Sequence, residues 1–267
     1  MLTYREIVNA LIDLKLDRHI PVIAHVSPSM CEKVKGGAST VLGAILAVVD
    51  NAMLPSFTMR TLVIPENGPE NNAMEYGSGR ESNLSGEIFT KDLPVDQSEN
   101  PLAEVLRKYP QAQRSNHPAL SFIALGMNAA LESQTIENPY QPIQTLSDQD
   151  GWIVLMDTDQ THNFSIHLAE YLARRKQFIR WALTPAGIVE CPHFPGCPDG
   201  FNKLQYYIND IKHQTTISEL ICQSYPLKEL INTTVDLIKS EPYALLCNRL
   251  NCDRCNAVRK EVAAQSA

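Results

Sequence analysis

The sequence has few features that would place it in a membrane or on a nucleic acid. No uninterrupted apolar run reaches the roughly 18 residues of a membrane-spanning helix. The first residues lack the basic-then-apolar plan of a secretory signal, so we expect a cytoplasmic protein. Basic charge is in deficit, with 23 Lys and Arg against 30 Asp and Glu. This balance argues against a nucleic-acid partner and suits a cationic small molecule, although mild acidity also serves solubility.

The cysteines do not form two paired Cys-x2-Cys knuckles, which would be the strongest sign of a zinc site. There are seven, an odd number, and we expect reduced thiols rather than a disulfide framework. Three of them, Cys247, Cys252 and Cys255, have C-x4-C-x2-C spacing. Candidates upstream that would complete a tetrahedral structural zinc site are Cys191, His193 and Cys197. Metal-free thiols packing this region are the alternative, so no residue is assigned as a ligand.

Helical and strand patterns alternate along the chain, which favours an α/β fold with a mixed central sheet flanked by helices. Thr3 and Glu6 form a capping box at the start of the first helix. Helical patterns cover residues 4–15, 40–49, 101–109, 163–176, 200–212 and 226–240. Apolar runs predict buried strands over residues 20–26 and 152–156, and a further buried element over 122–125.

We expect a single domain over residues 1–267 with two distinctive parts. Residues 65–100 are rich in Gly, Pro, Asn and Ser and show little periodicity. Loops of that length are usually functional or mobile, so this insertion is either a candidate substrate lid or a flexible excursion. Residues 190–267 are expected to form a helical C-terminal part that contains the cysteine cluster.

The sharpest candidate for chemistry is the pair His167 and Glu170, which follows a predicted strand and a polar turn. In the first turn of a helix, the positive end of the helix dipole disfavours imidazolium, and a general base must be neutral. Glu170 lies three residues on and can accept the other ring N–H of His167. A solvated pair on a helix surface would give the same pattern, so the pair alone is weak evidence.

Three other polar segments precede it. The block from Arg114 to Ser121 packs a cation, hydroxyls and an imidazole into a turn, which either lines a pocket or only satisfies the backbone. Lys35, Gly36 and Gly37 precede a predicted helix, where free N–H groups can bind a phosphate, although a Gly-Gly pair is more often only a turn. Residues 55–58 read as an ordinary strand end.

Taken in order, five segments resemble the aminoglycoside 3-N-acetyltransferase family, also known as the antibiotic N-acetyltransferases, from near residue 5 to about residue 185. They are His25-Val26-Ser27, Gly36-Gly37, Pro55-Ser56-Phe57-Thr58, Arg114 to Ser121, and His167 to Glu170. Each is unspecific alone, but five in the right order are specific. The Arg/Gln-x-x-Gly-x-Gly/Ala loop of the other large acetyltransferase superfamily does not occur here, which is consistent.

The resemblance implies an acetyltransferase domain that moves the acetyl group of acetyl-CoA directly to a primary amine of an aminoglycoside, the aminocyclitol 3-amine. His167 would be the general base and Glu170 its helper. The cofactor-binding positions that the resemblance implies are Ser27, Lys35, Gly36, Gly37, Ser115 and Ser121. Recognition of a polycation needs carboxylates, and we take Asp157 and Asp159 as the substrate-binding candidates.

One position departs from the family pattern: Phe164 stands where members often carry threonine. Loss of that hydroxyl puts stabilisation of cofactor or intermediate in question. Two other classes stay open, namely a zinc-dependent hydrolase built on His167 and Glu170, and a non-catalytic binding protein for cationic small molecules. The sequence also leaves open a homodimer, and it gives no sign of a membrane partner.

Overall fold

The structure is a computed structural model that describes residues 1–96 and 100–265. Its α-helices are α1 (Tyr4–Asp13), α2 (Pro28–Lys33), α3 (Gly37–Val48), α4 (Pro101–Leu106), α5 (Asn128–Glu132), α6 (Gln141–Asp148), α7 (Ser165–Leu172), α8 (Leu227–Ser240) and α9 (Asp253–Gln265). Its strands are β1 (Val22–Val26), β2 (Ala52–Pro55), β3 (Leu62–Val63), β4 (Gln113–Arg114), β5 (Phe122–Leu125), β6 (Trp152–Met156), β7 (Phe178–Thr184), β8 (Gly187–Phe194), β9 (His213–Ile217) and β10 (Leu220–Pro226).

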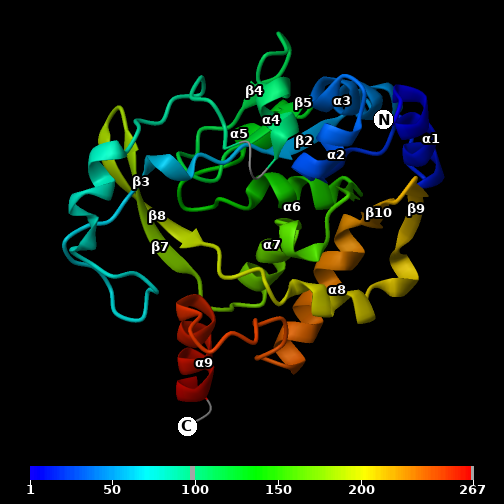
Figure 1. Ribbon diagram of the computed structural model, residues 1–267. Coiled ribbons are helices and arrows are strands. Elements are labelled where there is room, and N and C mark those ends of the chain that lie inside the picture. The colour runs from blue at the N-terminus through cyan, green and yellow to red at the C-terminus, as the bar shows by residue number, and fades with distance from the viewer. Residues whose placement is uncertain (97–99, 266–267) are drawn as a thin grey trace.

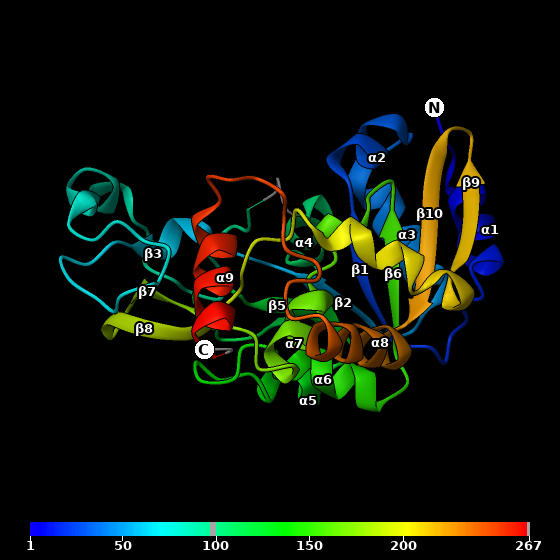
Figure 2. The same ribbon diagram turned by 90° about the horizontal axis from the view of Figure 1, so that it is seen from below.

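The central sheet has seven strands in the order β4-β5-β2-β1-β6-β10-β9 (Figures 1 and 2). Strand β1 runs parallel to both β2 and β6, and the remaining neighbours pair antiparallel. The predicted α/β class with a mixed sheet flanked by helices is therefore confirmed. The strands predicted from apolar runs are the inner ones, because a strand buried on both faces carries a continuous apolar sequence.

Two hydrophobic cores lie on opposite faces of this sheet. Along β1, Val22, Ala24 and Val26 join the core that α1 and α3 cover, whereas Ile23 joins the core that α6, α7 and α8 cover. This alternation follows from the two-residue period of a strand. His25 shares the face of Ile23, so its ring is directed toward the helices α6 to α8. Figure 1 shows α1 and α3 grouped apart from α6, α7 and α8.

A second sheet of three strands, β3-β7-β8, forms a separate lobe at one end of the molecule (Figure 2). The described residues of the 65–100 insertion wrap around it without forming an α-helix or a strand. Asn72 is buried, and its side chain accepts from the Ile179 N–H at 2.8 Å and donates to the Ile179 carbonyl at 3.1 Å. Phe89 N–H donates to the Leu183 carbonyl. Hydrogen bonds to β7 thus hold the insertion in place at two points. Its residues 97–99 lie outside the described residues.

Several elements differ from what the sequence pattern predicts. The helix expected over 163–176 ends at Leu172, because Arg174 adopts a left-handed φ of 58° and turns the chain. Residues 201–206 and 209–211 form 3-10 turns rather than the α-helix expected over 200–212. The C-terminal part from residue 190 contains α8 and α9, as expected, and also the β9–β10 hairpin. The residues of β9, HQTTI, have no regular alternation of polar and apolar side chains that would predict a strand. Among the described residues, no helix is long and apolar enough to cross a membrane.

Candidate functional site

The site forms where the parallel strands β1 and β6 end side by side. Val26 is in register with Met156, and the next residue on each strand is Ser27 or Asp157, at the end of the strand. Ser27 Oγ donates to Asp157 Oδ2 at 2.9 Å and accepts from the Met30 N–H, which caps α2. Adjacent carboxyl ends of parallel strands are where open α/β sheets bind ligands.

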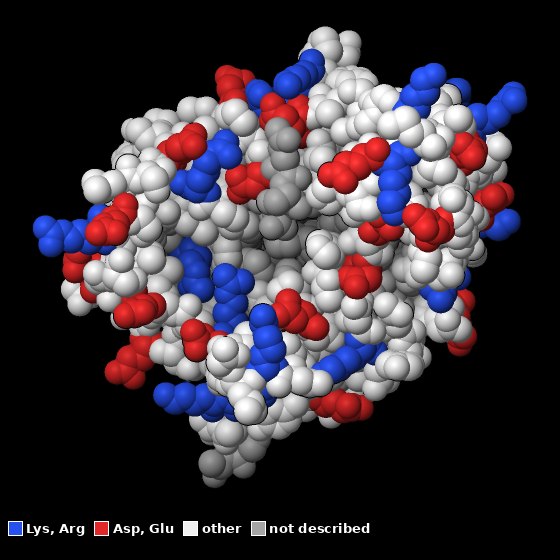
Figure 3. All heavy atoms as spheres, in the orientation of Figure 1, with Lys and Arg blue, Asp and Glu red and all other residues white. Residues whose placement is uncertain are grey.

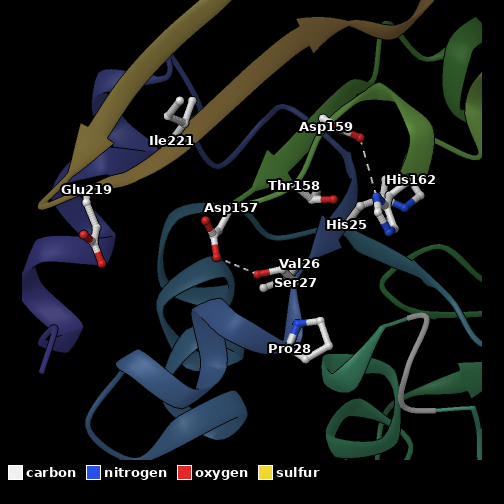
Figure 4. A pocket seen from close by; sticks show the side chains of 10 residues that line it. All are labelled: His25, Val26, Ser27, Pro28, Asp157, Thr158, Asp159, His162, Glu219 and Ile221. Atoms are coloured by element: carbon white, nitrogen blue, oxygen red, sulfur yellow. Dashed lines mark hydrogen bonds and ion pairs between the residues drawn. The ribbon is translucent and has the colours of Figure 1, made fainter. Parts of the chain in front are cut away.

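A cavity of about 400 Å³ opens at these strand ends (Figure 4). Three carboxylates line it: Asp157 and Asp159 after β6, and Glu219 in the β9–β10 turn. Among its described lining residues there is no Lys or Arg, and Lys33 of α2 pairs with Glu219 at 3.2 Å from outside the lining. A concave surface lined by carboxylates concentrates cations, and the structure thus brings together both residues predicted to bind the substrate.

A second cavity, of about 540 Å³, lies against the first. His25 and His162 line both, so the two cavities meet at these rings. The second cavity reaches His167 in α7 and is walled by aromatic side chains, including Phe57 and Phe164. It extends to the small lobe through Leu62 of β3. The cleft therefore joins an acidic chamber to a chamber with aromatic walls, the apolar cavity, which contains the predicted base.

His167 is the third residue of α7, in its first turn as predicted. Its Nδ1 lies 2.7 Å from Glu170 Oε2, and both side chains are buried. The other oxygen of this carboxylate, Oε1, accepts from Nη1 of Arg175 at 3.0 Å. Arg175 is held in turn by the carbonyls of Pro242 and Ala244. The chain thus builds a buried row of three groups in which an arginine orients the carboxylate and the carboxylate orients the imidazole.

The charge on Glu170 fixes the tautomer of His167. Burial raises the pKa of Glu170, but the hydrogen bond from His167 and the charge of Arg175 outweigh it and hold the pKa below its usual value. An ionised carboxylate only accepts hydrogen bonds, so the ring proton resides on Nδ1 of His167. Its Nε2 then carries a free lone pair, and no described residue donates to it. That is the arrangement a general base requires.

His25 is a second imidazole at the junction of the two cavities. Burial lowers its pKa to about 3, and nearby His162 adds to this effect, so the ring is neutral at physiological pH. Its Nε2 is buried without a hydrogen-bond partner among the described residues. Buried polar atoms are normally paired, so this unpaired nitrogen in a residue that lines both cavities is a candidate contact for a ligand. The sequence showed His25 only as part of a His-x-Ser segment and gave no reason to single it out.

The position of Phe164 explains the departure from the family's threonine. Its ring contacts Phe57 at a centroid distance of 4.6 Å and His167 at 5.2 Å, and it also meets Phe122 and Tyr140. Phe201 flanks the imidazole from elsewhere, with ring centroids 4.9 Å apart. The His167 ring therefore lies between aromatic rings, and packing takes the place of a hydroxyl at position 164.

The positions predicted to bind the cofactor are spread over three places. Ser27 lines the acidic cavity, but its hydroxyl is already engaged by Asp157 and Met30. Gly36 and Gly37 begin α3 with φ of +89° and +62°, and no side chain caps that helix end. Lys35 beside them is exposed. The Gly37 N–H donates to the Val34 carbonyl at 3.0 Å, so an anion here would rely on the N–H groups that follow Gly37 in the first turn of α3 and on the lysine.

Ser115 and Ser121 lie elsewhere. The Ser115 hydroxyl donates to the Phe122 carbonyl and accepts from the Phe122 N–H. Ser121 Oγ accepts a hydrogen bond from Nε of Arg114 at 3.0 Å. Both serines are buried, and neither is among the described residues that line the two cavities. Arg114 also donates to the carbonyls of Ser56 and Leu93. This block therefore ties the 65–100 insertion to the central sheet.

Four of the cysteines come together near the apolar cavity. The sulfurs of Cys197, Cys247, Cys252 and Cys255 all lie within 4.8 Å of one another. Of the upstream candidates, Cys197 belongs to this group and Cys191 and His193 do not. Burial raises the pKa of the other three thiols: to about 11 for Cys31, and to about 12 for Cys191 and Cys222. The clustered thiols are thus the ones arranged for metal binding.

Charges elsewhere on the surface are mixed. Figure 3 shows Lys and Arg interspersed with Asp and Glu over the face drawn, without a continuous basic surface among the described residues. This distribution agrees with the deficit of basic charge in the sequence. The concentration of like charge in the acidic cavity is therefore a local feature.

Comparison with known proteins gives consistent matches. A family model described as aminoglycoside 3-N-acetyltransferase matches residues 23–239. The SPbeta prophage-derived aminoglycoside N(3')-acetyltransferase-like protein YokD of Bacillus subtilis (strain 168) is 28% identical over 183 residues, 63% of this chain and 65% of that protein. Aminoglycoside N(3)-acetyltransferase IX of Micromonospora chalcea is 30% identical over 192 residues, 67% of this chain and 66% of that protein. Each match thus spans just under two thirds of the relative.

Solved structures share the fold over most of the chain. The crystal structure of YokD superposes with a TM-score of 0.77 and 21% identity over 90% of this chain and 94% of that one. The apoenzyme of aminoglycoside acetyltransferase AAC(3)-IVa superposes with a TM-score of 0.74 and 16% identity over 97% of each chain. AAC-IIIb, solved as a binary complex with CoASH, superposes with a TM-score of 0.71 and 17% identity over 90% of this chain and 97% of that one.

Proposed function

The chain belongs to the aminoglycoside 3-N-acetyltransferase family, and from that membership we propose that it transfers the acetyl group of acetyl-CoA to a primary amine of an aminoglycoside. The observation that carries the proposal is the row His167, Glu170 and Arg175, because His167 lines a cavity that is joined to an acidic chamber. A base, a cation site and room for a thioester are the three things this reaction needs.

In the proposed mechanism the amine attacks the thioester directly. The nitrogen forms a bond to the acetyl carbon while Nε2 of His167 takes the proton that the amine must lose. The carbon–sulfur bond then breaks, and the coenzyme A thiolate leaves and takes up a proton. General-base assistance of this kind contributes about 10²–10⁴-fold. Glu170 stabilises the imidazolium that forms and keeps the ring oriented, and Arg175 keeps Glu170 in place.

We assign the acidic chamber to the amine substrate. Asp157, Asp159 and Glu219 line it. Glu219 already pairs with Lys33, and a polycationic sugar offers ammonium groups to the two aspartates. Asp159 is also fixed by Asn202 and Thr161, whose hydrogen bonds lower its pKa although burial raises it. It therefore remains charged at physiological pH. Since the Ser27 hydroxyl is engaged with Asp157, we expect Ser27 to act on ligands by positioning that carboxylate.

The cofactor is proposed to bind through the open N-terminus of α3, with Lys35, Gly36 and Gly37 near its phosphates. The helix dipole and free N–H groups favour an anion there. AAC-IIIb with bound CoASH has the same fold, and AAC(3)-IVa has been solved as a mutant in complex with gentamicin. Both ligands of the proposed reaction thus have precedents on this fold.

The proposal is tested by following free thiol release from acetyl-CoA in the presence of a panel of aminoglycosides. We expect turnover with at least one of them and a loss of at least about a hundredfold in His167→Ala. His19→Ala, which changes an exposed histidine before β1, is the matched control and should keep full activity.

Two outcomes would select another class. Binding of an aminoglycoside without consumption of acetyl-CoA would indicate the non-catalytic binding protein. Turnover that disappears with a chelator while the fold is retained would favour the zinc-dependent hydrolase. The geometry argues against the latter, because the candidate metal ligands found among the described residues are four cysteines, and four thiolates leave zinc no open position for a substrate.

A further inference from the structure

Four cysteine side chains from two distant parts of the chain converge behind the wall of the apolar cavity. Cys197 follows β8, Cys247 and Cys252 lie in the connection between α8 and α9, and Cys255 is in the first turn of α9. Their sulfurs lie within 4.8 Å of one another, and all four residues are buried and unpaired by disulfides. We propose that these four thiolates bind a structural zinc ion that holds α9 against the active-site wall.

The spacing of the sulfurs suits a tetrahedral zinc centre. A Zn–S bond of about 2.3 Å places the sulfurs of a tetrahedron roughly 3.8 Å apart, which lies inside the observed limit. Soft thiolate ligands select zinc over the hard cations magnesium, calcium and manganese. Four protein ligands close the coordination sphere, so the ion would serve structure rather than catalysis.

The surroundings supply what a charged thiolate centre needs. Zinc with four thiolates carries a net charge of −2. Nη2 of Arg249 lies 3.7 Å from Sγ of Cys197, and the Cys247 N–H donates to Sγ of Cys255 at 3.4 Å. Hydrogen bonds from outside the ligand set orient ligands and offset their charge. Arg249 also pairs with Asp199, which fixes the arginine on the segment that carries Cys197.

The C-terminal helix α9 buries little apolar surface of its own. Of the described residues of α9, only Cys255, Ala257 and Val258 are buried. The connection from residue 241 to residue 252 contains turns but no strand or α-helix. Three small or medium buried side chains give little hydrophobic stabilisation. Polar contacts from Lys176, Asn71 and Gly196 also reach α9. A metal that links both segments to Cys197 would add a strong attachment to these contacts.

This attachment reaches the proposed active site. Gly196, Pro198 and Asp199 flank Cys197 and line the cavity that contains His167, and Arg254 of α9 lines it too. Nη1 of Arg254 donates to the Gly196 carbonyl at 3.2 Å. A Cβ placed on Gly196 would lie 3.8 Å from Oε2 of Glu170, so this segment directly adjoins the base and its carboxylate. Loss of the metal should therefore disturb the cavity wall as well as α9.

The primary test is the metal content of the purified full chain, reconstituted with zinc under reducing conditions and measured by inductively coupled plasma mass spectrometry. We expect one zinc per chain. Cys252→Ala and Cys255→Ala should each lose most of it, and the matched control Cys31→Ala, at a buried thiol outside the cluster, should keep it. The thermal midpoint of the zinc-free chain should fall by roughly 10 °C or more.

A second measurement on the wild-type chain avoids variants that fail to fold. Replacement of zinc by cobalt(II) should give the strong visible absorption of a tetrahedral cobalt–thiolate centre, which is independent of acetyltransferase activity. The proposal is overturned if the reconstituted chain holds less than roughly a tenth of an equivalent of zinc. It is equally overturned if the two cysteine variants retain full zinc, or if intact mass shows these cysteines joined as disulfides.

Discussion

Glu170 and Arg175 form an ion pair in which Oε1 and Nη1 are 3.0 Å apart and both side chains are buried. Removing charges from water is costly, and such a pair persists only where further hydrogen bonds satisfy both groups. Here His167 donates to the second carboxylate oxygen, and two backbone carbonyls accept from Nη2 of Arg175, while its Nε has no partner among the described residues. The pair therefore acts as a fixed support for the imidazole, and its removal should be visible in the pH dependence of the reaction.

Arg175→Gln should shift the acidic limb of the kcat/KM profile to higher pH. The positive charge of Arg175 lowers the pKa of Glu170, so its loss raises that pKa. The carboxylate is then protonated at higher pH, and His167 loses its partner there. We also expect kcat at neutral pH to fall by about tenfold or more. The measurement is a steady-state profile of acetyl transfer against pH.

Two neighbouring variants make this result specific. Arg175→Lys keeps the positive charge, so the acidic limb should stay near its wild-type position even if kcat falls. Arg174→Gln removes an exposed charge next in the chain and should leave the profile as it is. An unchanged limb in Arg175→Gln would mean that the arginine serves only the packing of residues 242–244.

Phe164→Thr, which restores the residue common in the family, should destabilise this chain. The ring contacts Phe57, Phe122, Tyr140 and His167, and threonine would leave a cavity among them. Truncating a buried aromatic ring costs about 3–5 kcal/mol of the free energy of unfolding. Denaturant unfolding should show this loss, whereas Phe164→Leu should cost less. A Phe164→Thr variant as stable as wild type would contradict the packing role.

The inner part of the fold could be predicted from the sequence because its signals are local. Residues 152–156 form β6 within the bounds that the apolar run indicated, and 227–240 form α8 where helical spacing indicated a helix. The hairpins β7–β8 and β9–β10 were not predicted. Their strands are half exposed, and in β9 only Ile217 is buried, so pairing with a neighbouring strand rather than composition makes them strands.

The candidate site could likewise be predicted only in part. The pair His167 and Glu170 could be predicted because three-residue spacing on a helix fixes their contact in advance. Arg175 could not be, because the helix ends before it and it reaches Glu170 only through the turn at Arg174. Cys197 joins Cys247 in space although 50 residues separate them, and spacing alone gave no reason to prefer it to Cys191.

The stability of the chain should fall steeply in mild acid, and His25 should account for part of that fall. Burial lowers the pKa of His25 to about 3, below the value of about 6.5 for an unfolded histidine. Between these values the unfolded chain binds the proton and the folded chain does not, so stability falls as pH falls. Each such group contributes up to about 1.4 kcal/mol per pH unit.

His25→Asn removes this titration and should flatten the pH dependence of the free energy of unfolding. We would measure urea unfolding of both proteins at about pH 7 and about pH 5, where the linkage is active. The difference between the two pH values should be smaller in the variant than in wild type. Burial lowers the pKa of His117 to about 4, so that residue should sustain part of the slope in both proteins. Equal slopes in the two proteins would show that His25 is charged when folded.

Asp157→Asn decides which ligand occupies the acidic chamber. Asp157 lines that cavity and accepts a hydrogen bond from Ser27. The sequence predicted Asp157 to bind the substrate and Ser27 to bind the cofactor, although the two are in direct contact. Losing one charge-assisted contact to an ammonium group should raise the KM for the aminoglycoside about tenfold, which corresponds to about 1.4 kcal/mol. The KM for acetyl-CoA should stay unchanged, because a carboxylate gives no favourable contact to phosphates.

Ser27→Ala should produce the same change in weaker form, since it removes the hydrogen bond that orients Asp157 but keeps the charge. Asp236→Asn, at an exposed position on α8, is the matched control for the aspartate change and should alter neither constant. A rise in the KM for acetyl-CoA in Asp157→Asn, with the aminoglycoside constant unchanged, would reassign the chamber to the cofactor. The amine would then have to reach Nε2 of His167 from the apolar cavity, past Asp199 and the segment that Cys197 anchors.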